Sequence, residues 1–581
     1  MKKSKKALSL ALAAAMTAGL LTGCGGGAAA DTGAAADTGS AENPVSEAAE
    51  AAGTNEAAGQ ETAGGADHSE FVTLDFYISN TPPAEQERVM EKANAIIKEA
   101  INAELNLVCV DPSTYAERIN LMINSGEEFD LCFMGNWGGF NFFENASKGA
   151  FVDMAPLFET YAPETYARIP EALWQGVTVN GGIYAAVNYQ QWGVAQRKGL
   201  RLRMDLAEEY GLDWQSLHNK PMLEVMKDIE PFLEQCVTND PELIGWETSA
   251  NGSMFLQDPL YWDMEAVGGD TYQPGWVSYD DPTTVINQFE TEEYAEFCNI
   301  MREYYEKGLV RKDGATLQDT TPDRTAGRIV ALWDYGWPDM IDAIELGVAP
   351  EGIESLDDVT CEKFQELGLT GLTDYRMSMY EEKDKPAINI STTRTVIPAT
   401  AGATACVAIS STSKHPERAM ELIELLNTND ELFNLIQWGE EGIDYNWDEN
   451  GEKKNVEGKY FFTYNEWQIG QSYSPDFTRS DFKNNKITGD SQKAKCQVVF
   501  DADLTADPSP VTGFEFNPDP VKTELANCAA IINEVAPVLN NGASDPAELL
   551  PKFIQRLKDA GVDAIIAEKQ AQLDAWLEAN G

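Results

Sequence analysis

Tryptophans beside glycine, proline or polar residues are the clearest candidates for chemistry in this chain. The sequence has thirteen tryptophans, and many stand outside apolar periodic runs. An indole face can cover the apolar C–H side of a sugar ring, while nearby carboxylates and amides exchange hydrogen bonds with its hydroxyls. The residues that we expect to bind a ligand in this way are Trp137, Trp192, Trp262, Trp276, Trp333, Asp334 and Trp337.

Packing in a core is the alternative for any one of these tryptophans, because a buried indole leaves the same local pattern. Trp137 and either Trp333 or Trp337 are favoured because they follow predicted strands of the first lobe, and ligands of α/β folds gather at the carboxyl ends of strands. The others are expected to come from the opposite lobe. We assign four tryptophans to structure, namely Trp174, Trp214, Trp467 and Trp576.

Arg394 is a lone cation in the polar segment 392–395, which has the pattern of a strand. Its guanidinium could fork onto a carboxylate of an acidic ligand. The alternative is a surface or internal ion pair, because the chain offers 95 acidic residues as partners.

Metal and catalytic motifs are sparse. Asp444, Asn446 and Asp448 have the spacing of a calcium loop, but Glu449 stands where that loop needs glycine. Three histidines give little material for a catalytic triad or a zinc site. We therefore expect no metal, no cofactor and no enzymatic activity. A glycoside hydrolase is the catalytic alternative, because such an enzyme uses two carboxylates on either side of a cleft. Acidic pairs are too abundant in this chain for a catalytic pair to be recognised.

The first 24 residues have the pattern of a secretory segment. Four lysines precede the apolar run 7–21, which is too short to span about 30 Å of hydrocarbon. Leu21, Thr22, Gly23 and Cys24 resemble the lipobox of bacterial lipoproteins. The resemblance implies a signal peptide over 1–23 and a lipid on Cys24 that holds the chain at the extracellular face of the cell membrane. Residues 24–69 offer little to bury, so we expect a disordered tether.

Charge and cysteine usage limit the partners. The formal net charge is −53, which argues against a nucleic-acid partner. Besides Cys24 there are eight cysteines without CxxC spacing, several of them inside apolar runs. We expect free buried thiols, with disulfides as the alternative. We also expect a monomer.

Strand-like and helix-like segments alternate from residue 71 onward. This alternation predicts an α/β fold whose sheets are mostly parallel and covered by helices. Strands are expected at 71–78, 105–110, 129–134, 182–188, 327–334 and 404–409, and helices at 84–104, 115–124, 203–210, 221–235, 292–307 and 413–426.

The chain beyond residue 70 is too long for one hydrophobic core, so two lobes are expected. We expect the first lobe over 70–188, the second over 189–325, and a return to the first over 326–400. Residues 401–581 would complete the second lobe and add a C-terminal helical region. Several crossings between two lobes imply a hinge.

Two segments carry a family resemblance. Residues 410–427, SSTSKHPERAMELIELLN, resemble the Ser-Lys-Asn-Pro-Glu-x-Ala segment of extracellular solute-binding proteins of bacterial ABC importers. Residues 438–445, WGEEGIDY, are similar to a Tyr-Gly-Ile-Glu-Gly-x-His-Tyr turn in a lipoprotein branch associated with carbohydrate uptake. Asp444 stands where that turn has histidine, so no role of the histidine is carried over. Segments 148–157 and 182–187 agree with the same family.

The resemblance implies a type II periplasmic-binding-protein fold, with two α/β lobes and a ligand in the cleft between them. It also implies capture of an extracellular carbohydrate, here expected to be an oligosaccharide, and its delivery to the permease subunits of an ABC transporter. A peptide-binding or adhesive lipoprotein is the alternative outside catalysis.

Overall fold

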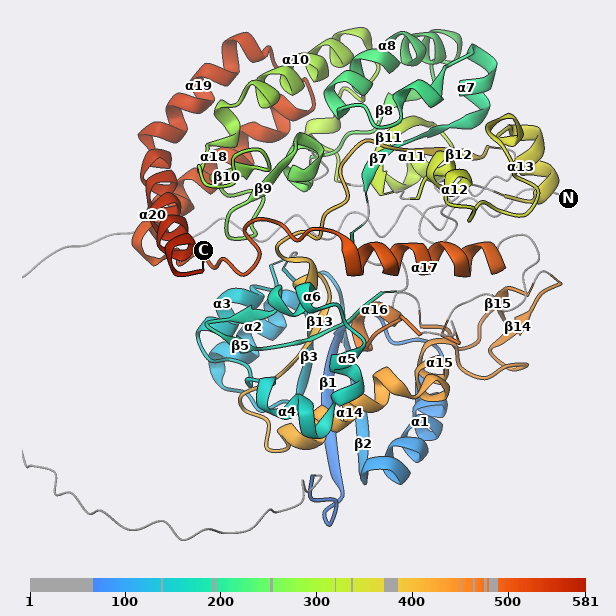
Figure 1. Cartoon of the computed structure of the whole chain (residues 1–581), viewed down its shortest axis with the longest axis vertical. Coiled ribbons are helices and arrows are strands. Elements are labelled where there is room, and N and C mark those ends of the chain that lie inside the picture. Colours follow the sequence, from blue (N-terminus) through green and yellow to red (C-terminus); the bar gives the residue numbers. More distant parts are fainter. Residues whose placement is uncertain are drawn as a thin grey trace, which may run out of the picture. The chain divides into compact units, whose positions relative to one another are not determined.

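Two hydrophobic cores organise the part of the chain that the structure describes. The computed structural model describes residues 66–580 except 137–138, 191–193, 196, 251–253, 319, 336–337, 370–384, 450, 463–464, 475–477 and 480–488. One core draws its buried residues from 72–195 and 397–500, and the other from 200–390 and 521–565. We call the corresponding parts the first and the second lobe, and each is a sheet flanked by helices (Figure 1).

The first lobe is built on a five-stranded sheet with the order β2-β1-β3-β13-β6. β1 pairs in parallel with β2 and β3, whereas β13 runs antiparallel to both β3 and β6. Every second residue of β1 is buried, from Val72 to Ile78, as expected for a strand with one face on the core. The strands are β1 (Val72–Ser79), β2 (Ala103–Val110), β3 (Leu131–Met134), β6 (Ala186–Val187) and β13 (Cys406–Ile409).

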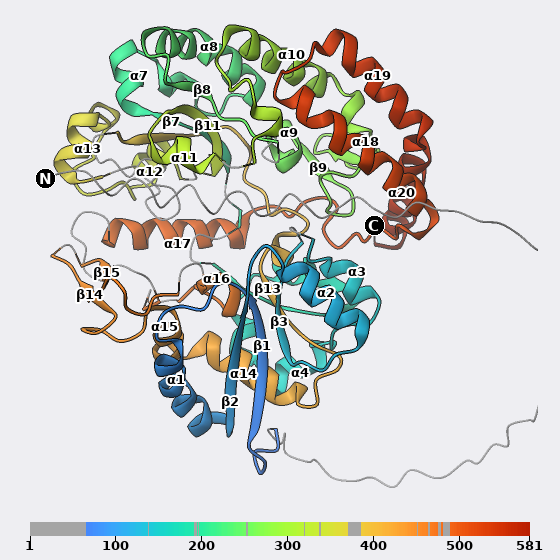
Figure 2. The ribbon, with the colours of Figure 1, turned by 180° about the vertical axis from the view of Figure 1, so that it is seen from behind.

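Helices cover this sheet with apolar faces. In α1 (Gln86–Ile101) the predicted face is buried at Val89, Ala93, Ile97 and Ile101, and the helix lies beside β2 (Figure 2). The other helices are α2 (Tyr115–Ser125), α3 (Phe142–Ser147), α4 (Ala155–Tyr161), α5 (Pro163–Ala167), α6 (Glu171–Gln175), α14 (Pro416–Thr428), α15 (Asp430–Trp438) and α16 (Glu466–Ile469). Two hairpins pair β4 (Thr178–Val179) with β5 (Gly182–Ile183), and β14 (Tyr445–Trp447) with β15 (Lys453–Asn455).

The second lobe is built on a four-stranded sheet with the order β12-β7-β11-β8. Only the pairing of β11 with β8 is parallel within this sheet, because β7 runs antiparallel to both neighbours. The strands are β7 (Lys198–Arg203), β8 (Ile244–Trp246), β11 (Ile329–Tyr335) and β12 (Ala387–Ser391), with a separate hairpin of β9 (Met264–Ala266) and β10 (Trp276–Ser278). The helices are α7 (Met204–Tyr210), α8 (Met222–Asn239), α9 (Met254–Gln257), α10 (Glu292–Lys307), α11 (Thr321–Thr325), α12 (Met340–Glu345), α13 (Cys361–Leu367), α18 (Lys522–Asn540), α19 (Pro546–Asp559) and α20 (Val562–Asn580).

The lobe assignment of the later segments was wrong. Residues 326–400 do not return to the first lobe, because β11 and β12 both belong to the second sheet. Most of 401–505 is not second lobe either, because β13, α14 and α15 contribute to the first core. An apolar strand after a helix fits either sheet equally well. Periodicity therefore predicted the strands but could not say which sheet they join.

Three segments connect the two lobes. They run between β6 and β7, between β12 and β13, and from α17 (Gly489–Thr505) toward α18. The second and third crossings bond to each other at Ile397, whose N–H donates to the Asp507 carbonyl and whose carbonyl accepts from the Ser509 N–H at 2.8 Å.

The helix α17 has two opposite apolar faces. Cys496 and Phe500 are buried in the first core, whereas Ala494 and Val498 pack against the second. Residues four apart share a helix face, and residues two apart point roughly opposite ways. This helix therefore contacts both cores.

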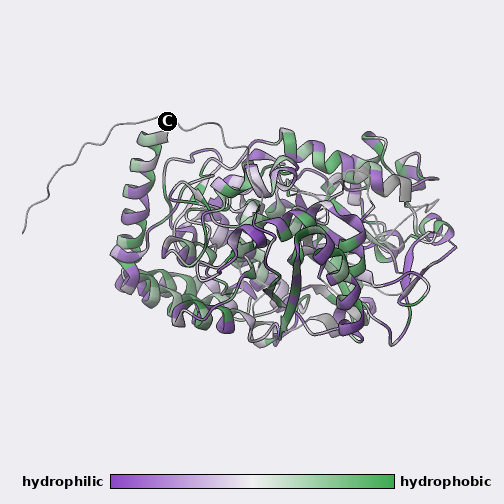
Figure 3. Ribbon diagram, turned by 90° about the horizontal axis from the view of Figure 1, so that it is seen from below, coloured by the Kyte–Doolittle hydropathy of each residue, from purple (hydrophilic) through white to green (hydrophobic). Residues whose placement is uncertain are grey.

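Figure 3 shows apolar and polar residues interspersed along the helix that ends at the C-terminus, α20. Within the described residues, none of the helices combines the length and the apolar character needed to cross a bilayer.

Candidate functional site

Three asparagines follow three strands at one edge of the first sheet. Asn80 follows β1, Asn136 lies two residues after β3, and Asn188 follows β6. β1 is parallel to β3, and both β3 and β6 are antiparallel to β13, so the carboxyl ends of these strands share an edge. Amides at such an edge can donate to and accept from the hydroxyls of a small polar ligand.

Two aromatic residues of the first lobe complete this edge: Trp467, which was assigned to structure from the sequence, and Tyr473, which was not predicted. The Asn188 Nδ2 donates to the carbonyl of Trp467 at 2.9 Å, and the Trp467 ring meets Phe133 edge-on with centroids 5.0 Å apart. Tyr473 donates its N–H to the Tyr189 carbonyl at 3.2 Å. Both Trp467 and Tyr473 are half-buried. Their polar neighbours in sequence were the available signal, the same one that singled out Trp137 and Trp192.

The second sheet presents Glu247 and Trp333 at the carboxyl ends of its parallel pair, β8 and β11. Trp333 is half-buried, and its ring meets Tyr261 edge-on with centroids 6.1 Å apart. The Glu247 carboxylate is 5 % exposed and pairs with the Arg324 guanidinium, at 2.5 Å for the longer of the two bonds. Trp333 lies two residues before the end of β11, and this strand belongs to the second lobe instead of the first.

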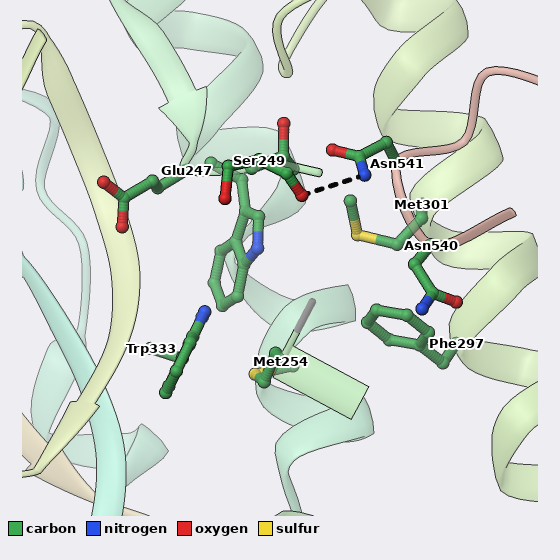
Figure 4. A pocket seen from close by; sticks show the side chains of 10 residues that line it. Glu247, Ser249, Met254, Phe297, Met301, Trp333, Asn540 and Asn541 are labelled. Atoms are coloured by element: carbon green, nitrogen blue, oxygen red, sulfur yellow. Dashed lines mark hydrogen bonds between the residues drawn. The ribbon is translucent and has the colours of Figure 1, made fainter. Parts of the chain in front are cut away.

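A small cavity lies next to these residues (Figure 4). Its lining includes Trp246, Ser249, Phe297, Trp333 and Asn541, and its volume of about 10 Å³ matches roughly one water molecule, not a sugar. The Asn541 Nδ2 donates to the Ser249 carbonyl at 3.2 Å, as the dashed line in Figure 4 shows. The cavity is therefore too small to hold a sugar.

A buried carboxylate holds the first crossing. Asp503 of α17 is 2 % exposed and accepts from the Tyr189 hydroxyl at 2.6 Å and from the Ala195 N–H at 2.7 Å. It also accepts from the Val194 N–H at 3.0 Å. Burial raises the pKa of Asp503, although these hydrogen bonds oppose the shift. The crossing is thus fixed at residues 194 and 195, next to the segment that contains Trp192.

A second buried cluster lies in the second lobe, at the point where the first and second crossings join it. His218 Nδ1 lies 2.9 Å from Asp339 Oδ2, and His218 Nε2 lies 3.5 Å from Asp342 Oδ1. The hydrogen bond with Asp339 raises the pKa of His218 against the effect of burial. Burial opposes ionisation of Asp339, yet the hydrogen bond and charge of His218 keep the pKa of Asp339 below its ordinary value.

The same three side chains have the spacing of metal ligands, since their ligand atoms lie within 4.8 Å of one another. Their donor and acceptor capacity is already taken by protein groups. Asp339 also accepts from three backbone N–H groups, and an Nη of Arg197 lies 3.7 Å from Asp342 Oδ1. A guanidinium at that distance already supplies positive charge, so we assign the cluster to a hydrogen-bond network.

Two predicted ligand contacts lie in the core of the second lobe. Trp276 is fully buried and Trp262 is 6 % exposed. Both stack on Phe255, with ring centroids 5.6 and 4.7 Å away, and the Trp262 indole N–H donates to the Phe255 carbonyl. Their ring faces pack on protein, so the structure shows for these two tryptophans the packing that was the alternative to ligand binding. The aromatic stack needed tertiary contacts that sequence neighbours do not show.

Arg394 and Asp444 each pair with an oppositely charged side chain of the protein, Arg394 at the surface and Asp444 in the interior. Arg394 pairs with Asp263 through both arms of its guanidinium, and it lies over the Tyr279 ring at 4.9 Å. For Arg394 the structure therefore shows the alternative of an ion pair, at the surface. Asp444 is fully buried and accepts from Arg88 and from the N–H groups of residues 440 and 460. Those bonds engage both carboxylate oxygens of Asp444 with groups of the protein, so the side chain is not arranged as a calcium ligand.

The other predicted site residues lie outside the described part of the chain. These are Trp137, Trp192, Trp337, Cys24 and the side chain of Asp334.

The chain is similar in sequence and in fold to proteins whose ligands or roles are known. Over 524 residues the chain is 26 % identical to a carbohydrate ABC transporter substrate-binding protein of Streptococcus pneumoniae, covering 88 % of this chain and 92 % of that protein. It superposes on the solved N-glycan transport solute-binding protein NgtS of the same species with a TM-score of 0.66 and 21 % identity, covering 88 % of this chain and all of that one. The chain has the two-lobed fold of these solute-binding proteins.

Two further matches cover parts of the chain. Residues 510–578 match a domain of unknown function, DUF3502, and these residues contain α18, α19 and most of α20. Over 230 residues the chain is 22 % identical to the lipoprotein LipO of Bacillus subtilis, covering 37 % of this chain and 40 % of that protein. The solute-binding fold therefore includes a C-terminal helical segment with its own family model.

Proposed function

We propose that this protein captures an extracellular oligosaccharide and delivers it to the permease of an ABC transporter. The observation that carries the proposal is the similarity, over 88 % of the chain, to a carbohydrate ABC transporter substrate-binding protein. NgtS has been solved in complex with Man5GlcNAc, which makes a short glycan the first class to test here. The asparagines and half-buried aromatics at the two carboxyl edges are suitable contacts for sugar hydroxyls and ring faces.

Binding would proceed by closure of the lobes about the three crossings. A ligand that contacts both edges stabilises the closed state by its differential affinity, and the closed state then docks on the permease. The expected contacts are Asn80, Asn136, Trp333, Trp467 and Tyr473. Trp137, Trp192, Asp334 and Trp337 remain proposals at the same edges. The protein would act as a monomer, and no covalent step is required.

A lipid on Cys24 would keep the receptor at the extracellular face of the membrane, near its permease. The similarity to the lipoprotein LipO supports this anchor. Replacing Cys24 by Ala should leave glycan affinity intact and lower uptake by cells. Loss of affinity in this variant would contradict the separation of anchor from binding domain.

The direct test adds Man5GlcNAc, and as a comparison kestose, to the purified protein. Binding is measured by calorimetric titration, by the melting temperature and by tryptophan fluorescence. Binding should raise the melting temperature and change tryptophan fluorescence, without release of free sugar. Hydrolysis of a glycan would instead establish a glycoside hydrolase. A rise in melting temperature with peptides alone would establish a peptide-binding lipoprotein.

A further inference from the structure

The cluster of His218, Asp339, Asp342 and Arg197 joins parts of the second lobe that lie far apart in sequence. Asp339 is the N-cap of α12 and lies four residues after the end of β11, the strand that carries Trp333. Arg197 lies on the first crossing, directly before β7. We propose that this cluster is a positioning site that couples the ligand-facing end of β11 to two interlobe crossings, with His218 as its removable charge. This inference rests on the function proposed above.

Asp339 supplies the first link, between β11, α12 and β12. Its Oδ1 accepts from the N–H groups of Ile341 and Asp342 at 2.9 and 3.0 Å, which caps α12. Its Oδ2 accepts from the Ser391 N–H at 2.7 Å, and Ser391 is the last residue of β12. One fully buried carboxylate therefore fixes both the entry into α12 and the point where the second crossing begins.

Arg197 supplies the second link, to the first crossing. Its Nε donates to the Thr393 carbonyl at 2.5 Å, and an Nη lies 3.7 Å from Asp342 Oδ1. The neighbouring Lys198 N–H donates to Thr393 Oγ1 at 2.8 Å. The first and second crossings therefore leave the lobe side by side, and the cluster touches both.

His218 balances the charge at the centre of the cluster. Two carboxylates and one guanidinium surround it, and its two ring nitrogens face one carboxylate each. A protonated imidazole donates from both nitrogens, whereas a neutral one donates from only one. When His218 loses its proton, Arg197 remains as the only cation among the four residues, and Asp339 and Asp342 repel each other more strongly. The coupling should therefore weaken as the pH rises through the pKa of His218.

The experiment uses the full mature protein and the variant His218→Gln, with His415→Gln as the matched control. His415 lies at the start of α14 in the first lobe, away from the cluster. Amide hydrogen exchange measured without ligand should become faster in His218→Gln at 197–203, 340–345 and 387–393 together. The affinity for Man5GlcNAc, titrated from pH 6 to pH 9, should fall about fivefold or more in the wild-type protein and stay nearly flat in His218→Gln. His415→Gln should follow the wild type in both measurements.

The outcomes separate failure of the coupling from failure of the proposed function. Faster exchange confined to 214–222, or an unchanged pH profile of affinity in His218→Gln, would overturn the coupling while leaving the proposed function intact. If no glycan binds the wild type at any pH, the proposed function fails, and the role of the cluster in ligand binding fails with it. Should His218→Gln not fold, Asp342→Asn provides the second variant, because it leaves the Asp339 cap in place and removes the repulsion that deprotonation of His218 creates. The affinity of this variant for Man5GlcNAc should vary less with pH than that of the wild type, and an unchanged pH profile would overturn the coupling.

Discussion

Two buried carboxylates hold the interlobe crossings, and they differ in how they are satisfied. Asp503 accepts from a tyrosine hydroxyl and two backbone N–H groups, all of them neutral donors. Asp339 accepts from three N–H groups and also faces His218. The pKa of Asp503 is raised and that of Asp339 is lowered, so the second lobe stabilises the charged form and the first does not. The two carboxylates accept from the same number of neutral groups, three each, and differ in that only Asp339 also faces a histidine.

The largest effect should come from Asp339→Ala. The change leaves the N–H groups of Ile341, Asp342 and Ser391 without their acceptor and leaves His218 without its closest anion. Removing one partner of a buried pair costs about 3–5 kcal/mol of the free energy of unfolding. Urea denaturation would measure it. Asp339→Asn is the control, because asparagine also caps helices, and its loss should be clearly smaller.

A smaller loss is expected for Asp503→Ala. Neutral N–H groups at Val194 and Ala195 would lose their acceptor, at a cost of about 1–3 kcal/mol. Asp503→Asn keeps an acceptor oxygen and should recover part of it. A loss in Asp503→Ala as large as that in Asp339→Ala would contradict the distinction between the two carboxylates.

A third substitution tests one donor alone. Tyr189→Phe removes the hydroxyl that donates to Asp503 but keeps the ring, which packs against Tyr473 and Phe500. The expected cost is about 0.5–1.5 kcal/mol, because Asp503 retains two N–H donors. Thermal or urea unfolding of this variant, compared with Asp503→Ala, measures how much of the stabilisation at Asp503 comes from the tyrosine hydroxyl.

The smallest effect is a difference in pH dependence. His218 has a raised folded pKa, so its contribution to stability is fully present below its unfolded pKa of about 6.5 and is lost as the pH rises through the folded value. Asp503 also has a raised folded pKa, so its contribution grows as the pH falls from that value toward about 3.9.

Urea midpoints from pH 4 to pH 9 would separate the two windows. His218→Gln should flatten the neutral-to-alkaline arm, and Asp503→Asn should flatten the acid arm. Interchanged effects would show that the pH dependence is assigned to the wrong lobe.

Local periodicity predicted the elements well, and helix 292–307 has the bounds of α10. Periodicity could not predict which segments far apart in sequence pair or pack with one another. The strand at 327–334 is apolar on both faces, and such a strand fits any α/β sheet. Trp262 and Trp467 illustrate the same limit at the site. Each has an acidic neighbour in sequence, yet Trp262 stacks on Phe255 in a core while Trp467 is half-buried at a sheet edge. Only the packing of distant segments separates these two environments.

The two-faced helix α17 has a consequence for engineering. Cys496 and Phe500 complete one core while Ala494 and Val498 contact the other, so neither lobe has a self-contained surface at this helix. A chimera that takes its second lobe from a relative would have to choose which core α17 matches, and the other would be left with a poor fit. The two lobes of this protein should therefore diverge together, with α17 as the element that ties their sequences to each other.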